Sequence, residues 1–225
     1  AATSSGEPLM PMAIHAATNP SKIATVMLQS GETLTYGELD KRSIQLARLL
    51  ADAGLVEGDV VALFMENNIR YHEIYWAVVR SGMYLCAVNK YLTAEEAAYI
   101  VNDSGAKALL TSVGVADVAK AMLTDLQDCP VRLVTDGPLD GYIAYEGEVA
   151  KHSSEPLDAE PLGDFMNYSS GTTGRPKGIK RPLSGNTFAA PSALDALLGN
   201  LYGLNKDTVY LSPAPLYHSA PLAFT

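Results

Sequence analysis

The sequence predicts an α/β fold in which mostly parallel sheets carry helices on both faces. Short apolar runs such as Val60–Met65 and Tyr84–Val88 have the length of strands, and they lack the apolar–polar alternation of a sheet with one wet face. Segments with helical periodicity stand between these runs, so strands and helices alternate along the chain. The 225 residues, 48% of them hydrophobic and 18% charged, are enough to build a large buried core and exclude a disordered chain.

Two capping boxes mark the clearest helix starts. Thr35 is followed three residues later by Glu38, apolar residues then recur at helical spacing, and Gly54 supplies a left-handed stop. Thr93 and Glu96 repeat the same pattern. The sequence therefore predicts one helix from Thr35 to Gly54 and a second helix beginning at Thr93.

The remaining elements follow from apolar runs, caps and turn residues. We predict, in chain order, the strand Val60–Met65, a helix capped by Asn67 or Asn68 that ends at Ser81-Gly82, the strand Tyr84–Val88, a helix from Thr93 to about Val101, the strand Ala108–Thr111, the helix Ala116–Leu126, the strands Val131–Thr135 and Asp164–Tyr168, the helix Thr187–Asn200 and the strand Thr208–Leu211.

Residues 147–163 are expected to form a surface crossover, because this stretch is rich in Pro, Ser, Glu and Asp and has little apolar periodicity. On this basis we divide the chain into a first α/β lobe over residues 1–163 and the start of a second lobe over residues 164–225. The last residues, Pro221–Thr225, are apolar, whereas natural termini are more often polar. We therefore expect a truncated piece of a longer protein.

Charge, cysteine and histidine content limit the classes of function. With 25 acidic against 16 basic residues the net charge is −9, which disfavours a nucleic-acid partner. No apolar run has the length of a membrane-spanning helix, and Ala1–Gly6 lacks the features of a signal peptide. Cys86 lies in an apolar run and is expected to be a buried, inert thiol, which suits a reducing cytoplasm. The four histidines lack the spacing of metal ligands.

The segment Ser169–Gly178 (SSGTTGRPKG) has the composition of an anion-binding loop. Its glycines allow the backbone to approach an anion, and its hydroxyls add neutral donors or a magnesium ligand. Pro176 stiffens the loop before Lys177, whose ammonium adds a point charge. The segment fits neither a Walker loop, because Gly178 follows the lysine, nor the hydrolase elbow, because Asn167 stands where that motif begins with glycine. It predicts a cradle for a polyphosphate.

This loop resembles the phosphate-binding segment of the adenylate-forming superfamily, which includes acyl-CoA synthetases, luciferases and the adenylation domains of peptide synthetases. The resemblance implies that the chain is part of the large N-terminal domain of that fold. It runs from about Ala24 onward and is also carried by Leu34–Leu39 with Gly58–Ala62, by Asn89–Thr93 through Asn102–Ala106, and by Pro213–Pro221.

The resemblance implies a two-step reaction. A carboxylate attacks the α-phosphorus of MgATP, which gives an acyl-adenylate and pyrophosphate, and a CoA thiol then displaces AMP. The chain would accordingly be the N-terminal part of an ATP-dependent acyl-CoA synthetase, an acid–thiol ligase of lipid metabolism that uses a fatty or lipid-like acid, ATP, Mg²⁺ and CoA. We expect the chain alone to be inactive, because the family's catalytic lysine and magnesium-holding glutamate lie further downstream.

The resemblance also implies roles for individual residues. His218 would act as a catalytic residue beside the carboxylate and the α-phosphate, Tyr217 would shape the mouth of the acyl tunnel, and both would contact the substrate. The β- and γ-phosphates would be wrapped by Ser169, Ser170, Gly171, Thr172, Thr173, Gly174 and Lys177, with the Ser169 hydroxyl on the magnesium side. The plain alternatives are a solvated turn for the loop, a surface lysine for Lys177, and core packing for Tyr217 and His218.

Other functions stay open. An acyl-AMP ligase or a domain that loads a carrier protein would share the first step and differ in the acceptor. A non-catalytic nucleotide-binding module would bind ATP or AMP without turnover. The sequence does not identify the carboxylic acid, and it leaves pairing of identical chains as an alternative.

Overall fold

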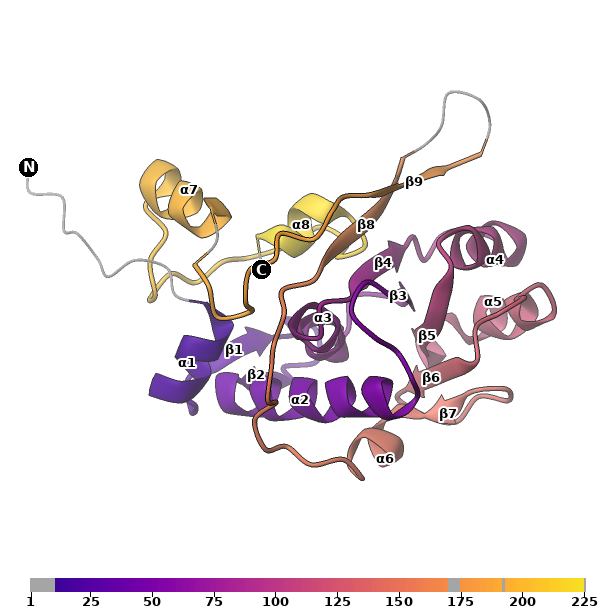
Figure 1. Ribbon diagram of the computed structural model, residues 1–225, viewed down its shortest axis with the longest axis horizontal. Helices are drawn as coiled ribbons and strands as arrows, with labels where there is room; N and C mark the ends of the chain where they lie inside the picture. Colours follow the sequence, from indigo (N-terminus) through magenta and orange to yellow (C-terminus); the bar gives the residue numbers. More distant parts are fainter. Residues whose placement is uncertain (1–10, 170–174, 192, 225) are drawn as a thin grey trace, which may run out of the picture.

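The computed structural model describes residues 11–169, 175–191 and 193–224, and within this part the main sheet has seven strands in the order β7-β6-β5-β3-β4-β8-β9 (Figure 1). The strands are β1 (Ile23–Val26), β2 (Thr33–Thr35), β3 (Val60–Phe64), β4 (Tyr84–Val88), β5 (Ala106–Ser112), β6 (Val131–Thr135), β7 (Ile143–Ala144), β8 (Asp164–Ser169) and β9 (Lys177–Lys180). The helices are α1 (Met12–Thr18), α2 (Tyr36–Asp52), α3 (Arg70–Arg80), α4 (Ala94–Asp103), α5 (Ala116–Ala121), α6 (Tyr145–Val149), α7 (Ala193–Tyr202) and α8 (Ser219–Ala223).

Strand β3 lies inside the sheet and is buried along its whole length. Val61 and Leu63 face a core shared with α2 and α3, whereas Ala62 and Phe64 face a second core shared with α4 and α5. Figure 1 shows the two helix layers on opposite sides of the sheet. Strands β3 to β8 pair in parallel, and β9 is antiparallel to β8. The predicted fold class, mostly parallel with helices on both faces, is confirmed.

Both capping boxes form. The Thr35 hydroxyl accepts a hydrogen bond from the Glu38 amide at 3.2 Å, and the Glu38 carboxylate accepts one from the Thr35 amide at 2.9 Å. Thr93 and Glu96 repeat this exchange at the start of α4. Each box satisfies amide groups that the first turn of a helix leaves without partners, which is why α2 and α4 begin where the sequence predicts.

Two predictions near the end of the chain were wrong. The helix expected over 187–200 begins only at Ala193, because Thr187 forms a strand-like bridge with Pro161 and Phe188 is buried in the core. Residues 208–211 form no strand within the described chain, and Val209 is 97% exposed. Apolar alternation produces a strand only where a partner strand and a core face are present.

The crossover before β8 is tied to the first helices by Arg80. Its guanidinium is 2% exposed and donates to Asp40 at 2.8 Å, to Ser43 at 2.6 Å and to Glu160 at 2.7 Å. Three residues after Glu160, the Gly163 amide donates to the Val79 carbonyl at 2.7 Å, and β8 then begins beside β4. The main sheet thus continues past residue 163, and the division into two lobes stays a prediction.

Buried His72 makes the stability of the chain depend on pH. Burial lowers the pKa of His72 from 6.5 to about 4. Within the described chain, the ring's only hydrogen-bond partner is the Thr25 hydroxyl, 3.3 Å from Nδ1. Between these two pH values the unfolded chain binds a proton that the folded chain does not, so folding stability rises with pH. The full difference corresponds to about 3 kcal/mol.

We therefore expect the free energy of unfolding, measured in urea, to rise more steeply from pH 4 to pH 6.5 in the wild type than in the variant His72→Leu. The neighbouring buried Glu73 titrates in both proteins, so its contribution largely cancels in the comparison. Equal slopes for the two proteins would contradict a neutral buried histidine.

In the described part of the chain, none of the helices combines the length and the apolar character that crossing a membrane requires.

Candidate functional site

The candidate phosphate loop closes a hairpin between β8 and β9. The two strands pair antiparallel with Ser169 opposite Lys177 and Tyr168 opposite Gly178. Pairing therefore brings the first and the last predicted phosphate ligands together at the mouth of the loop. Both residues are exposed. The sequence did not predict β9, because Lys177–Lys180 has neither an apolar run nor a clear alternation.

The sheet determines where this loop lies. Asp164 and Phe165 of β8 pair in parallel with Tyr84 and Leu85 of β4, so the carboxyl end of β8 points the same way as the carboxyl ends of its neighbours. Ligands of open α/β sheets bind outside the carboxyl ends of the strands. The position of Ser169 and Lys177 thus agrees with that of an anion site. Glycine-rich segments that follow a strand can present their amides to an anion.

Helix α4 contacts the hairpin on both sides, at Tyr168 in β8 and at Pro176 just before β9. The Tyr168 hydroxyl donates to the Asp103 carboxylate at 2.7 Å, and the Tyr99 hydroxyl donates to the Pro176 carbonyl at 3.1 Å. The Arg175 guanidinium lies over the Tyr99 ring, 5.0 Å from its centroid. Sequence reasoning missed these contacts because they join residues at least 65 positions apart.

Tyr217 and His218 form the second group of candidates. Their rings lie 4.4 Å apart, and Tyr217 also meets the edge of Tyr91, which follows β4. The Asn67 side chain, just beyond β3, holds this segment by donating to the Ala214 carbonyl at 3.1 Å and accepting from the Leu216 amide at 2.9 Å. The pair is therefore fixed near the carboxyl ends of β3 and β4.

The two aromatic candidates differ in exposure. Tyr217 is half-buried, whereas His218 is exposed, so core packing does not explain the histidine. Their assigned contacts with a carboxylate and an α-phosphate stay predictions. Five of the predicted phosphate ligands lie outside the described residues: Ser170, Gly171, Thr172, Thr173 and Gly174.

A Mg²⁺ ion at this site would be held by the Ser169 hydroxyl and by the phosphates of the bound nucleotide. Mg²⁺ is commonly held by one or two carboxylates, waters and substrate phosphates. Among the described residues, no three His, Cys, Asp or Glu side chains gather into a metal site. The exposed Ser169 hydroxyl is free to approach an ion that arrives with a triphosphate, and its role as a metal ligand stays a prediction.

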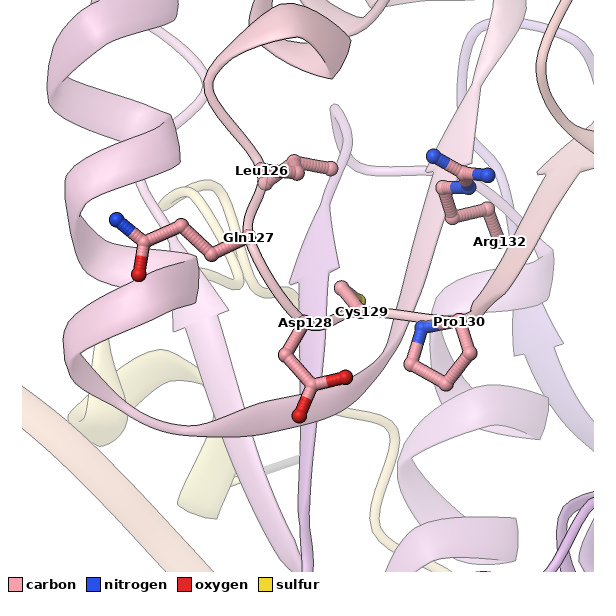
Figure 2. A pocket seen from close by; sticks show the side chains of 6 residues that line it. All are labelled: Leu126, Gln127, Asp128, Cys129, Pro130 and Arg132. Atoms are coloured by element: carbon pink, nitrogen blue, oxygen red, sulfur yellow. The ribbon is translucent and has the colours of Figure 1, made fainter.

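A hollow of about 210 Å³, at the loop before β6, is lined by none of the candidate site residues. Figure 2 shows the residues that line it along the loop leading into β6: Leu126, Gln127, Asp128, Cys129, Pro130 and Arg132. This loop lies at the amino end of β6, away from the carboxyl edge that carries the hairpin. Burial raises the pKa of the Cys129 thiol to about 12, so the hollow offers no thiolate nucleophile. Cys86 is also buried with a pKa raised to about 12, as expected for an inert thiol.

Comparison with known proteins gives one consistent family. Residues 12–225 match the family model described as AMP-binding enzyme. The chain is 33% identical over 205 residues to the 2-succinylbenzoate–CoA ligase of Geobacillus kaustophilus strain HTA426, which covers 91% of this chain and 38% of that protein. It is 34% identical over 166 residues to the fatty acid–[acyl-carrier-protein] ligase ScoC of Streptomyces coeruleorubidus, which covers 73% of this chain and 31% of that protein.

A solved structure shows the same fold. The apo structure of MbtA from Mycobacterium smegmatis superposes with a TM-score of 0.76 at 24% sequence identity, and the match covers 98% of this chain and 41% of that one. The chain thus spans about a third of the length of these two curated relatives, 38% of one and 31% of the other.

Proposed function

Because the chain belongs to the family of AMP-binding enzymes, we propose that the loop between Ser169 and Lys177 binds the triphosphate of ATP. One observation supports this proposal most strongly. The β8–β9 pairing sets Ser169 and Lys177, which flank a glycine- and hydroxyl-rich sequence, opposite each other at the carboxyl end of β8. A polyanion held there would meet backbone amides, hydroxyls and one ammonium group at the same time.

We assign the chain's residues two tasks in the reaction. The ammonium of Lys177 neutralises charge on the β- and γ-phosphates, which makes pyrophosphate a better leaving group. His218, beside Tyr217, orients the carboxylate toward the α-phosphorus. The bond that forms joins a carboxylate oxygen to the α-phosphorus, and the bond that breaks joins the α-phosphorus to the oxygen bridging to the β-phosphorus. Mg²⁺ supplies further charge neutralisation when it is bound with ATP.

The complete activity is assigned to a whole protein of the relatives' length. We propose that this protein forms an acyl-adenylate from a carboxylic acid and transfers the acyl group to CoA. A fatty or lipid-like acid is the proposed substrate, and the names of the two relatives, a 2-succinylbenzoate ligase and a fatty acid ligase, mark the range to be tested.

We expect Lys177→Gln to weaken the binding of MgATP to the 225-residue chain about tenfold, because the exposed ammonium at the loop mouth is lost while the length of the side chain is nearly kept. Lys41→Gln removes the same charge from the exposed face of α2 and should leave affinity unchanged. Isothermal titration calorimetry measures both. Wild-type affinity in Lys177→Gln would contradict the proposed phosphate contact.

A carrier-protein ligase is the second candidate, favoured by the 34% identity to ScoC. The two readings differ in the acceptor of the acyl group. The whole protein, given ATP and a panel of acids, should form a thioester with free CoA if it is a CoA ligase. Transfer only to a phosphopantetheinylated carrier protein would identify the alternative. Sustained pyrophosphate release by the 225-residue chain alone would overturn the expectation that it is inactive.

A further inference from the structure

We propose that Tyr99 and Asp103 of α4 are positioning residues that hold the β8–β9 hairpin at Pro176 and Tyr168 and so set the positions of Ser169 and Lys177. This inference rests on the proposed function for its link to ATP. The contacts that carry it are made by Tyr168 in β8 and by Pro176 just before β9.

The hairpin needs an anchor because the sheet supports only its base. Strand β8 pairs with β4 at Asp164 and Phe165, and from Met166 onward its ladder partner is β9. A two-stranded ribbon is only marginally stable by itself in water. The end of the hairpin that carries the loop therefore depends on contacts other than the ladder of the main sheet.

Helix α4 supplies those contacts from one face. Tyr99 and Asp103 stand four residues apart in the helix, so their side chains lie next to each other on its surface. Tyr99 donates to the carbonyl of Pro176, the residue just before β9, and Asp103 accepts from Tyr168 of β8. Figure 1 shows α4 beside the ends of β8 and β9 that carry the loop.

Two further features support the same arrangement. A Cβ atom on Gly178 would lie 3.0 Å from the Tyr168 hydroxyl and 2.6 Å from the Met166 side chain, so glycine at this position leaves room for the Tyr168 ring to reach Asp103. The Arg175 guanidinium stacks over Tyr99, which adds a cation–π contact to the hydrogen bond at Pro176. Burial and the Asp103 contact raise the pKa of the Tyr168 phenol, which keeps it a donor at working pH.

The position of Asp103 in α4 indicates that its carboxylate does not stabilise the helix itself. It is the last residue of α4, where a negative charge is unfavourable beside the partial negative charge of the helix end. A substitution that removes this carboxylate should therefore leave the helix as stable or slightly more stable. If Asp103→Ala lowers the protection of the hairpin amides from hydrogen exchange, the cause would then be the missing contact with Tyr168, because the helix itself is not weakened.

The primary test is amide hydrogen exchange of the 225-residue chain without nucleotide. We expect Tyr99→Phe, Tyr168→Phe and Asp103→Ala each to speed exchange about five- to tenfold in peptides covering residues 166–180. Asp103→Asn keeps an oxygen that accepts from Tyr168 and should restore slow exchange. Tyr142→Phe is the matched control, because it removes a hydroxyl that donates to the Ala119 carbonyl at 2.7 Å, far from the hairpin.

The outcomes separate the two proposals. Faster exchange at the hairpin in the three variants, with rescue by Asp103→Asn, supports positioning by α4. Unchanged exchange at 166–180, with thermal stability lowered only as in Tyr142→Phe, overturns it. MgATP affinity is then measured on the same proteins, and it should fall about fivefold in Tyr99→Phe and Tyr168→Phe. Absence of MgATP binding by the wild type would count against the proposed function, whereas the exchange result would still decide the role of α4.

Discussion

Gly163→Ala is expected to destabilise the chain by about 3 kcal/mol, because the new methyl group has no space. A Cβ atom at this position would lie 2.1 Å from the carbonyl oxygen and 2.9 Å from the amide nitrogen of Met83. Both atoms belong to backbone, so neither can rotate away as the end of a side chain would. Relief requires the start of β8 to move away from β4, which would also disturb the hairpin that β8 carries.

Urea unfolding of Gly163→Ala measures this loss, and Gly147→Ala is the matched control. Gly147 lies within α6, and a Cβ atom there meets nothing within 4 Å. The control should be stabilised by about 0.5–1 kcal/mol, since alanine is the better helix residue. If Gly163→Ala unfolded at the same urea concentration as the control, the close approach of the two strands would be refuted.

Arg80→Met is expected to cost about 3 kcal/mol, the second large effect. The guanidinium is almost completely buried, and its removal leaves Asp40, Ser43 and Glu160 without their shared donor. We place the expected loss at the lower end for a broken buried pair, because the Asp40 and Glu160 side chains are 29% and 24% exposed and can reach water. The free energy of unfolding of Arg80→Lys should lie between those of the wild type and Arg80→Met, since lysine keeps the charge and loses the planar guanidinium.

Arg48→Met serves as the comparison for Arg80. Arg48 also donates to the crossover, at the Glu155 and Pro156 carbonyls, but at the surface of the molecule. Its loss should cost less than about 1 kcal/mol. The free energies of unfolding in urea, together with the rate of proteolytic cleavage in residues 150–163, test the pair. Equal stability of Arg80→Met and Arg48→Met would show that the buried cluster does not fasten the crossover.

The parts of the fold that the sequence predicted are those with local causes. The hydroxyl of Thr35 and the carboxylate of Glu38 are three residues apart, so the start of α2 needs no information from the rest of the chain. The run Tyr84–Val88 contains only apolar residues and became β4 with the predicted bounds. Burial on both faces leaves one architecture for such strands, which is a sheet between two helix layers.

The features that the sequence did not predict depend on contacts between residues far apart in the chain. The start of α7 was misplaced because Phe188 is held in the core by a T-shaped contact with Trp76 and by the Arg80 guanidinium over its ring. In the candidate site, the composition of the loop indicated which residues would bind phosphate. The pairing of Ser169 with Lys177, in contrast, could not be predicted without knowing that β9 forms. No local pattern indicates that Tyr99 would meet Pro176, which is 77 residues later.

The strand order has a consequence for the chain during synthesis. Strand β4 borders β3 on one side, and the place on its other side is taken by β8, which the ribosome makes only after β5, β6 and β7. At about 5–20 residues per second, the apolar edge of β4 waits on the order of 4 to 15 seconds for its neighbour. An uncovered edge strand is a template for pairing with other chains. The nascent protein therefore passes through an interval in which protection of this edge by a chaperone would raise the yield of folded molecules.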